Sequence, residues 1–209
     1  MFGVAAASAS VAVGSRGLFA RAGIGALVTQ YRSDPRLGPL GLELLSYGKS
    51  AQEALDSLVV TATPHHGWRQ LAVIDRAGRI AHYAGGNIEG VYAAAVRPGV
   101  VALGESLADR AVPQAEVDAF AEDARPPLPE RLLRGLEAGL AAGGDIEPLR
   151  SAALLIVYRE SFPSVDLRID DSPDPIAALR RLLQAYEPQA EEFVLHAIAP
   201  DRADWGRMR

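Results

Sequence analysis

The chain has 209 residues, of which 49% are hydrophobic, and this is enough for one domain with a sizeable core. It has no cysteine, which excludes disulfides, thiolate metal sites and a cysteine nucleophile. A formal net charge of −5 argues against nucleic-acid binding, and no apolar run approaches the roughly 20 residues of a membrane helix. Because no basic residues precede the apolar opening, we expect no signal peptide and a cytoplasmic location.

The first half of the chain predicts strands that enclose a pair of helices. Residues 4–14 form a strand with small side chains on both faces, with Val4, Ala6 and Ser8 on one face and Ala5 and Ala7 on the other. A loop over 17–23 precedes a strand over 24–30. Leucines at helical spacing over 37–45 predict a helix, and a capping box that begins at Ser50 starts the next helix. Strands are then expected over 68–75, 79–84, 91–96 and 100–103.

The second half repeats this alternation of paired helices and strands. Helices are expected at about 113–123 and 129–142, separated by two prolines. Residues 151–158 are apolar on both faces, which predicts a covered strand, and 165–169 pairs beside it. Asp174 caps a helix, and a last helix begins at Pro188. We assign residues 1–188 to the main domain and 189–209 to a C-terminal helix and tail.

Helices that come in pairs between runs of strands favour an α+β fold over a doubly wound sheet. The economical arrangement is a layered sandwich of two sheets with helix pairs outside.

Several phrases, in a fixed order, carry a resemblance to a known family. They are Gly3-Val4-Ala5-Ala6-Ala7-Ser8, Arg69-Gln70-Leu71-Ala72-Val73-Ile74-Asp75, Gly143-Gly144-Asp145, and Val165-Asp166-Leu167-Arg168-Ile169-Asp170-Asp171. In this order they resemble the bacterial domain of unknown function 1028 family, which is Ntn-hydrolase-like (Ntn, N-terminal nucleophile). The resemblance implies a four-layer αββα sandwich and a hydrolase of amide or amidine C–N bonds.

The beginning of the chain departs from that family. Ntn hydrolases use a terminal Thr, Ser or Cys, whose own α-amine serves as the base. This chain begins Met1-Phe2, and the bulky Phe2 disfavours removal of the methionine. Family members usually carry one more strand before Gly3, so we expect a sandwich that lacks its first strand. The strand from Gly3 is then expected at a sheet edge or paired with another chain.

Six residues are pocket candidates, each with a plainer structural alternative. Ser8 is a possible nucleophile or a small strand residue, and Thr29 with Gln30 either lines the cleft or forms a strand-end hydrogen-bonding pair. Asp34 either binds a polar ligand group or forms a turn. Arg69 either clamps a carboxylate or lies on the surface, and His82 is either a general base or a hydrogen-bonded core residue.

Metal and phosphate sites are not expected. His65 and His66 are adjacent in a loop without carboxylate neighbours, which is a poor spacing for one metal. The glycine pairs at 85–86 and 143–144 lack the Lys and Ser/Thr of a phosphate-binding loop, and the second is better explained as a helix end. We therefore expect no cofactor and no metal.

Two hypotheses from different classes stay open. In the first, the protein is an amidohydrolase whose true start lies upstream with a Thr or Ser nucleophile. In the second, the start is genuine and the chain is a non-catalytic Ntn-like scaffold that binds a small polar molecule. We expect a homodimer or higher homo-oligomer, because closed twofold dimers are the commonest soluble assemblies.

Overall fold

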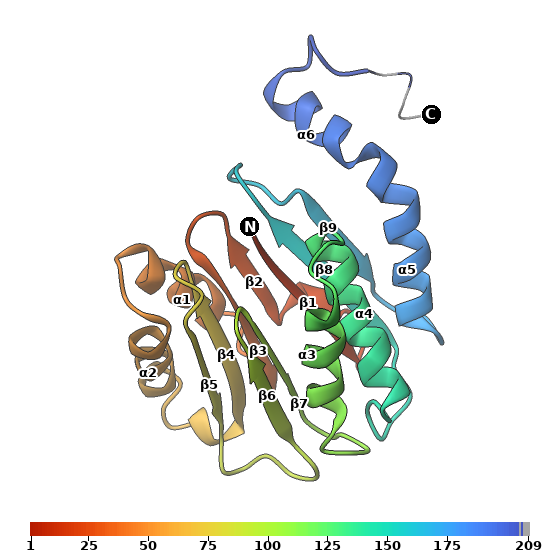
Figure 1. Cartoon of the computed structure of the whole chain (residues 1–209). Coiled ribbons are helices and arrows are strands. Elements are labelled where there is room, and N and C mark those ends of the chain that lie inside the picture. Colours follow the sequence, from red (N-terminus) through yellow and green to blue (C-terminus); the bar gives the residue numbers. More distant parts are fainter. Residues whose placement is uncertain (205, 207–209) are drawn as a thin grey trace.

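The computed structural model describes residues 1–204 and 206. They form a mixed α+β fold with several antiparallel sheets (Figure 1). The strand pairings of the described residues are all antiparallel, as expected for an α+β fold rather than a doubly wound one. Within the described residues, no helix combines the length and apolar character needed to cross a membrane.

The first sheet has the order β1-β8-β9. It contains β1 (Phe2–Ser8), β8 (Ser151–Val157) and β9 (Val165–Ile169), with Val4 opposite Leu155. The expected strand over 4–14 was too long, because the chain leaves the sheet after Ser8 and turns through the left-handed residue Ala12 into the short 3-10 helix η1 (Val13–Ser15).

The second sheet has the order β2-β3-β4-β5, and a separate hairpin joins β6 to β7. The strands are β2 (Leu18–Arg21), β3 (Gly25–Tyr31), β4 (Arg69–Asp75), β5 (Ile80–Ala84), β6 (Ala93–Arg97) and β7 (Val100–Gly104). The loop predicted over 17–23 was wrong in part. Leu18 is buried between the sheets, and pairing with β3 holds this short segment extended.

Two helices cover the outer face of the second sheet (Figure 1). They are α1 (Leu37–Ser46) and α2 (Ala51–Thr61), and the short helix η2 (His66–Trp68) follows them. The Ser50 hydroxyl accepts a hydrogen bond from the Glu53 backbone N–H, while the Glu53 carboxylate accepts one from the Ser50 backbone N–H. The predicted capping box is therefore confirmed.

The outer face of the first sheet packs against α4 (Leu128–Ala141) and α5 (Pro175–Tyr186), while α3 (Val112–Glu122) packs against α4 and the β6–β7 hairpin. Beyond α5 lie η3 (Glu187–Gln189) and α6 (Ala190–Ile198). The Asp174 side chain caps α5 as predicted, by accepting a hydrogen bond from the Ala177 N–H. Gly143 and Gly144 follow α4 with positive φ angles, as expected of a helix end.

A third cluster of apolar side chains joins the two sheets. Val4 and Ala6 of β1 meet Leu18 and Ala26 there, whereas Ala5 and Ala7 pack on the helix side. The two-residue alternation predicted for this strand is therefore confirmed. Because these side chains are small, β1 lies close to the second sheet on one face and to the helix layer on the other.

Within the chain β1 lies at a sheet edge, which is one of the two positions expected for it. β1 pairs with β8 along one edge, and no described strand pairs with its other edge. The same holds for β7, which pairs only with β6 among the described residues.

Candidate functional site

A cavity of about 1000 Å³ lies along the free edges of β1 and β7. It touches every residue from Met1 to Ser8 and every residue from Gly99 to Glu105. Successive side chains of a strand point to opposite faces, so a cavity over one face would touch only every second residue. A cavity that contacts consecutive residues must run along the strand edge. We call this part of the cavity the slot.

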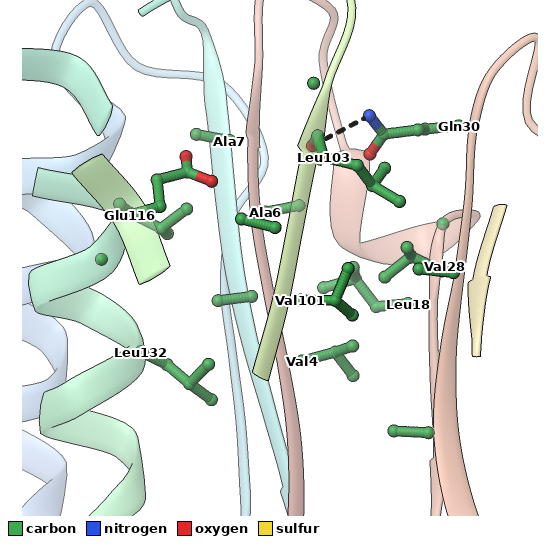
Figure 2. A pocket seen from close by; sticks show the side chains of 18 of the residues that line it. Val4, Ala6, Ala7, Leu18, Val28, Gln30, Val101, Leu103, Glu116 and Leu132 are labelled. Carbon is green, nitrogen blue, oxygen red and sulfur yellow. Dashed lines mark hydrogen bonds between the residues drawn. The ribbon is translucent and has the colours of Figure 1, made fainter. Parts of the chain in front are cut away.

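Two different layers form the walls of the slot (Figure 2). On one side, Val4 of β1 and Val101 of β7 lie near Leu18 and Val28 of the second sheet. On the other side, the slot is lined by α3 and α4, including Leu132. The slot therefore has the surroundings of a strand in the middle of a sandwich, with a sheet on one face and helices on the other.

Three carboxyl groups gather at the Ser8 end of the slot: Glu105, Glu116 and Asp145. Burial, together with the charge of Asp145, raises the pKa of Glu116 to about 8. Burial and the charge of Glu105 raise the pKa of Asp145 to about 7, although a hydrogen bond from the Ala9 N–H acts in the opposite direction. Both groups are thus poised to exchange protons near neutral pH.

Glu116 is held in place by glycines of the neighbouring helix. A Cβ atom at Gly139 would lie 2.5 Å from Oε1 of Glu116, and one at Gly135 would lie 3.3 Å from the Glu116 carbonyl oxygen. Only glycine lets the two helices approach this closely. The carboxyl points toward the slot beside Ala7 (Figure 2), and no hydrogen bond or ion pair to it is found within the described residues.

Gln30, one of the six candidates, lines the cavity and also forms hydrogen bonds that hold neighbouring strands together. Its Nε2 donates to Oε1 of Gln70 at 2.8 Å and to the Leu103 carbonyl at 3.2 Å (Figure 2). The fully buried Gln70 in turn donates to the carbonyls of Gly104 and Ala93. This glutamine pair ties the β6–β7 hairpin to the second sheet and so fixes one edge of the slot.

Ser8 and Thr29 also line the cavity. The Ser8 hydroxyl lies at the end of β1 and accepts a hydrogen bond from the Ser10 N–H. Thr29 is fully buried, and its hydroxyl accepts a hydrogen bond from the Asp34 N–H at 3.2 Å. Neither hydroxyl has a histidine beside it, because no described histidine lines this cavity.

Asp34 and Arg69 lie outside the residues that line the cavity. Arg36 binds the Asp34 carboxylate through two hydrogen bonds, at 2.9 and 2.8 Å, and Arg69 lies 3.5 Å away. The hydrogen bond from Arg36 lowers the pKa of Asp34 despite the opposing effect of burial. The pair stabilises the turn that leads into α1. Arg69 is not a surface residue, since its side chain is only 13% exposed.

His82 is exposed on β5 and does not line the cavity. The reading of His82 as a core residue was therefore wrong. β5 is an edge strand, so a polar residue there can face solvent even though its neighbours Ile80 and Ala84 share its face. Of the six candidates, the structure brings Ser8, Thr29 and Gln30 to one cavity and leaves Asp34, Arg69 and His82 outside it.

Glu116 was missed by sequence reasoning, although a signal was present. It lies four residues after Val112 and four before Phe120, both of which are buried and line the cavity. A carboxylate in the apolar stripe of a helix must lie in the interior unless the helix is displaced. This position should have marked it as a carboxyl group that faces the interior, where it is half-buried.

Comparison with known proteins identifies the family. The model of the family of unknown function DUF1028 matches residues 1–179. The chain belongs to the DUF1028 family. A crystal structure of a Silicibacter pomeroyi protein, also described as DUF1028, is 29% identical and superposes with a TM-score of 0.83 over 91% of this chain and 83% of the other. No curated protein matches this DUF1028 member significantly.

Proposed function

We propose that this DUF1028 protein is an Ntn-type amidohydrolase-like protein whose reaction centre lies at the Ser8 end of the slot. In this proposal the layers α1–α2, second sheet, first sheet and α4–α5 are the four layers of an αββα sandwich. The observation that carries the proposal is the slot itself, which runs along two strand edges between a sheet and a helix layer.

The chemistry requires a strand in that slot. In Ntn hydrolases the first residue of such a strand attacks the amide carbonyl through its hydroxyl or thiol, and its own α-amine takes the proton. The C–N bond breaks, the leaving amine is protonated, and water then releases the acyl group. A strand antiparallel to β1 would begin beside Ser8, close to Glu105, Glu116 and Asp145.

The test is the mature terminus of the protein purified from its native source, read by intact mass and N-terminal sequencing. The proposal expects a Thr, Ser or Cys terminus separated from Gly3 by about one strand of five to seven residues. It further expects that replacing that terminal residue by Ala abolishes hydrolysis in a panel of amide substrates. A mature terminus at Met1 would overturn the catalytic proposal.

A second candidate function is a non-catalytic Ntn-like scaffold that binds a small polar molecule. The observation favouring it is that no described serine or threonine of the cavity has a histidine or lysine beside it to act as a base. The same terminus measurement separates the two candidates. A Met1 terminus with ligand-dependent thermal stabilisation supports the scaffold, and turnover of an amide substrate contradicts it.

A further inference from the structure

We propose that Arg32, at the mouth of the cavity, binds the carboxylate of an anionic amide substrate, of which the N-acyl amino acids are the simplest class. The inference deepens the proposed function, because it names the substrate class of the same site and rests on that function for the reaction. The residues that carry it lie at the end of β3 and the start of β4, outside the slot. They are therefore the same whatever occupies the slot.

Arg32 lies at the same end of the cavity as the proposed reaction centre. It lines the cavity together with its neighbours Tyr31 and Ser33. It follows closely after Gln30, whose side chain donates to the Leu103 carbonyl, and Glu105 follows Leu103 at the end of β7. A molecule at this mouth therefore meets a cation beside the second sheet and carboxyl groups beside β7 and α3.

The backbone of Arg32 is fixed on both sides. Its N–H donates to the Trp68 carbonyl at 3.2 Å, and its own carbonyl accepts a hydrogen bond from Nη1 of Arg69. Arg69 is itself held in place, because its side chain is only 13% exposed and lies 3.5 Å from the Asp34 carboxylate. A binding residue whose backbone is already fixed loses less conformational freedom when the ligand arrives.

The residue before Arg32 has a strained backbone. Tyr31 has a φ of 67°, in the left-handed region that bulky side chains rarely adopt. Its ring stacks on Trp68 with an interplanar angle of 7°, and its hydroxyl accepts a hydrogen bond from the Glu89 N–H at 3.3 Å. The Arg32 guanidinium lies 5.5 Å from the centre of this ring. Tyr31 therefore sets both the direction in which the chain leaves β3 and the surface beside the guanidinium.

The other strained residues of the described chain lie around the same mouth. Ala12 follows β1 and Ser106 follows β7, with φ angles of 55° and 56°. With Tyr31, they are the non-glycine residues of positive φ among the residues that the structure describes. Strained backbone clusters at ligand-binding and catalytic sites, where the surrounding structure holds it. Three strands of different sheets thus end in strained residues next to one opening.

The guanidinium of Arg32 has donors to offer. Arg32 is exposed, and among the described residues its side chain contacts the Tyr31 ring but forms no hydrogen bond or ion pair. The hydroxyl of the half-buried Ser33 forms no hydrogen bond to any described residue either. A fork of N–H donors and a neighbouring hydroxyl therefore face a ligand together at this mouth.

The acidic groups close to this mouth already have partners in the chain. Asp34 is bound by Arg36 at 2.8 Å and lies 3.5 Å from Arg69, so its charge is compensated without Arg32. Glu105 accepts a hydrogen bond from the Ser106 hydroxyl at 2.7 Å. An anion from outside the chain is therefore the partner that suits Arg32.

The geometry favours a carboxylate over a phosphate. A planar carboxylate matches the guanidinium fork with two parallel hydrogen bonds. A phosphate dianion requires more donors than Arg32 and Ser33 provide, and it would be repelled by Glu105 and Asp145 at the same end of the cavity. An amide with one carboxylate places its charge at Arg32 and its uncharged C–N bond toward the reaction centre.

The test compares N-acetylglycine with its uncharged analogue N-acetylglycinamide, and inorganic phosphate serves as the third ligand. Binding to the full chain is measured at pH 7 by NMR titration. We expect N-acetylglycine to bind about tenfold more tightly than N-acetylglycinamide, because charge-assisted hydrogen bonds are about twice as strong as neutral ones. The amides of Arg32 and Ser33 should shift on binding. Equal affinity of the two acetylated ligands, or phosphate binding as tightly as N-acetylglycine, would overturn the inference.

Variants of two arginines complete the experiment. We expect Arg32→Gln to remove the preference for N-acetylglycine and Arg32→Lys to keep part of it, because lysine retains the charge but not the fork. Arg76→Gln is the matched control: Arg76 is also exposed and lines the cavity, but it lies in the turn between β4 and β5, at the opposite end of the second sheet. This control should keep the preference, and a preference that persists in Arg32→Gln would contradict the assignment.

Failure of this inference can be told apart from failure of the proposed function. Charge-dependent binding at Arg32 without hydrolysis of any amide would support the carboxylate site and count against the hydrolase alone. Hydrolysis of uncharged amides in preference to N-acyl amino acids, by the protein with its native terminus, would support the hydrolase and overturn the substrate class proposed for it.

Discussion

At the scale of single residues, Asp75 and Glu116 are two carboxyl groups in opposite settings, and each contributes to how the free energy of unfolding varies with pH. Asp75 is surrounded by donors: the N–H groups of Ala77, Arg79 and Ala51, and the Arg79 guanidinium at 2.7 Å. Glu116 has no such donors among the described residues. As pH rises, the contribution of Asp75 to the free energy of unfolding therefore increases, whereas the contribution of Glu116 decreases.

Glu116→Gln is expected to remove a loss of stability at alkaline pH. The pKa of Glu116 in the folded protein, about 8, lies above its ordinary value of 4.5. Its stabilising contribution is thus complete below about pH 4.5 and is lost as pH rises toward 8. We expect the variant to be more stable than the parent by about 2–4 kcal/mol at pH 9, with little difference at pH 5. Urea unfolding at both values measures this, and equal differences at the two values would contradict it.

Asp75→Ala is expected to destabilise the protein by about 2–4 kcal/mol at pH 7, because it leaves buried donors without an acceptor. Burial alone would raise the pKa of Asp75, but Arg79 and the backbone donors lower it below 3.8. Its contribution is therefore present above pH 3.8 and lost as pH falls through the lowered pKa. The exposed Asp56 supplies the control, and a loss for Asp56→Ala as large as for Asp75→Ala would refute the assignment.

At the scale of elements, the β6–β7 hairpin is positioned by the Gln30–Gln70 pair rather than by strand pairing with the second sheet. Gln70→Leu keeps the approximate volume but removes donors to Gly104 and Ala93. We expect a loss of about 1–3 kcal/mol and faster amide exchange throughout the hairpin. Gln52→Leu, at an exposed site on α2, is the control. Unchanged exchange in the hairpin would contradict this role for the pair.

Among the helices and strands, those marked by local residue spacing were predictable from the sequence, and those that depend on distant strands were not. The alternation of β1 and the capping box at Ser50 depend on local spacing, so they were predictable. β2 was missed because four residues are too few to show a period, and pairing with β3 holds them extended. His82 was misplaced because edge or central position depends on distant strands.

The candidate site was predictable only in part, for the same reason. Ser8, Thr29 and Gln30 stand at strand ends, where cleft residues are expected, and they do line the cavity. For Asp34 the sequence favours a turn and for Arg69 a surface position, and the ion pair between them depends on residues far apart in the chain. Glu116 comes near Asp145 only through the packing of α3 on α4, which no local pattern encodes.

At the scale of the whole molecule, the two sheets and their helix layers meet around a slot bounded by two strand edges. Free strand edges promote association between chains, and the homodimer expected from the sequence stays a prediction. Sedimentation velocity at micromolar and millimolar concentrations tests it. A single monomeric species at both concentrations would contradict the expectation.

The most direct test of the slot is residue-level amide exchange of β1 by NMR, in the chain that begins at Met1 and in the protein with its native terminus. The account predicts that every second amide of Phe2–Ser8, those facing the slot, exchanges quickly in the protein alone. These same amides should be protected when an upstream strand of the protein fills the slot, together with amides of Val100–Gly104. Uniform protection of β1 in the chain that begins at Met1, or fast exchange of these amides when an upstream strand is present, would contradict the account.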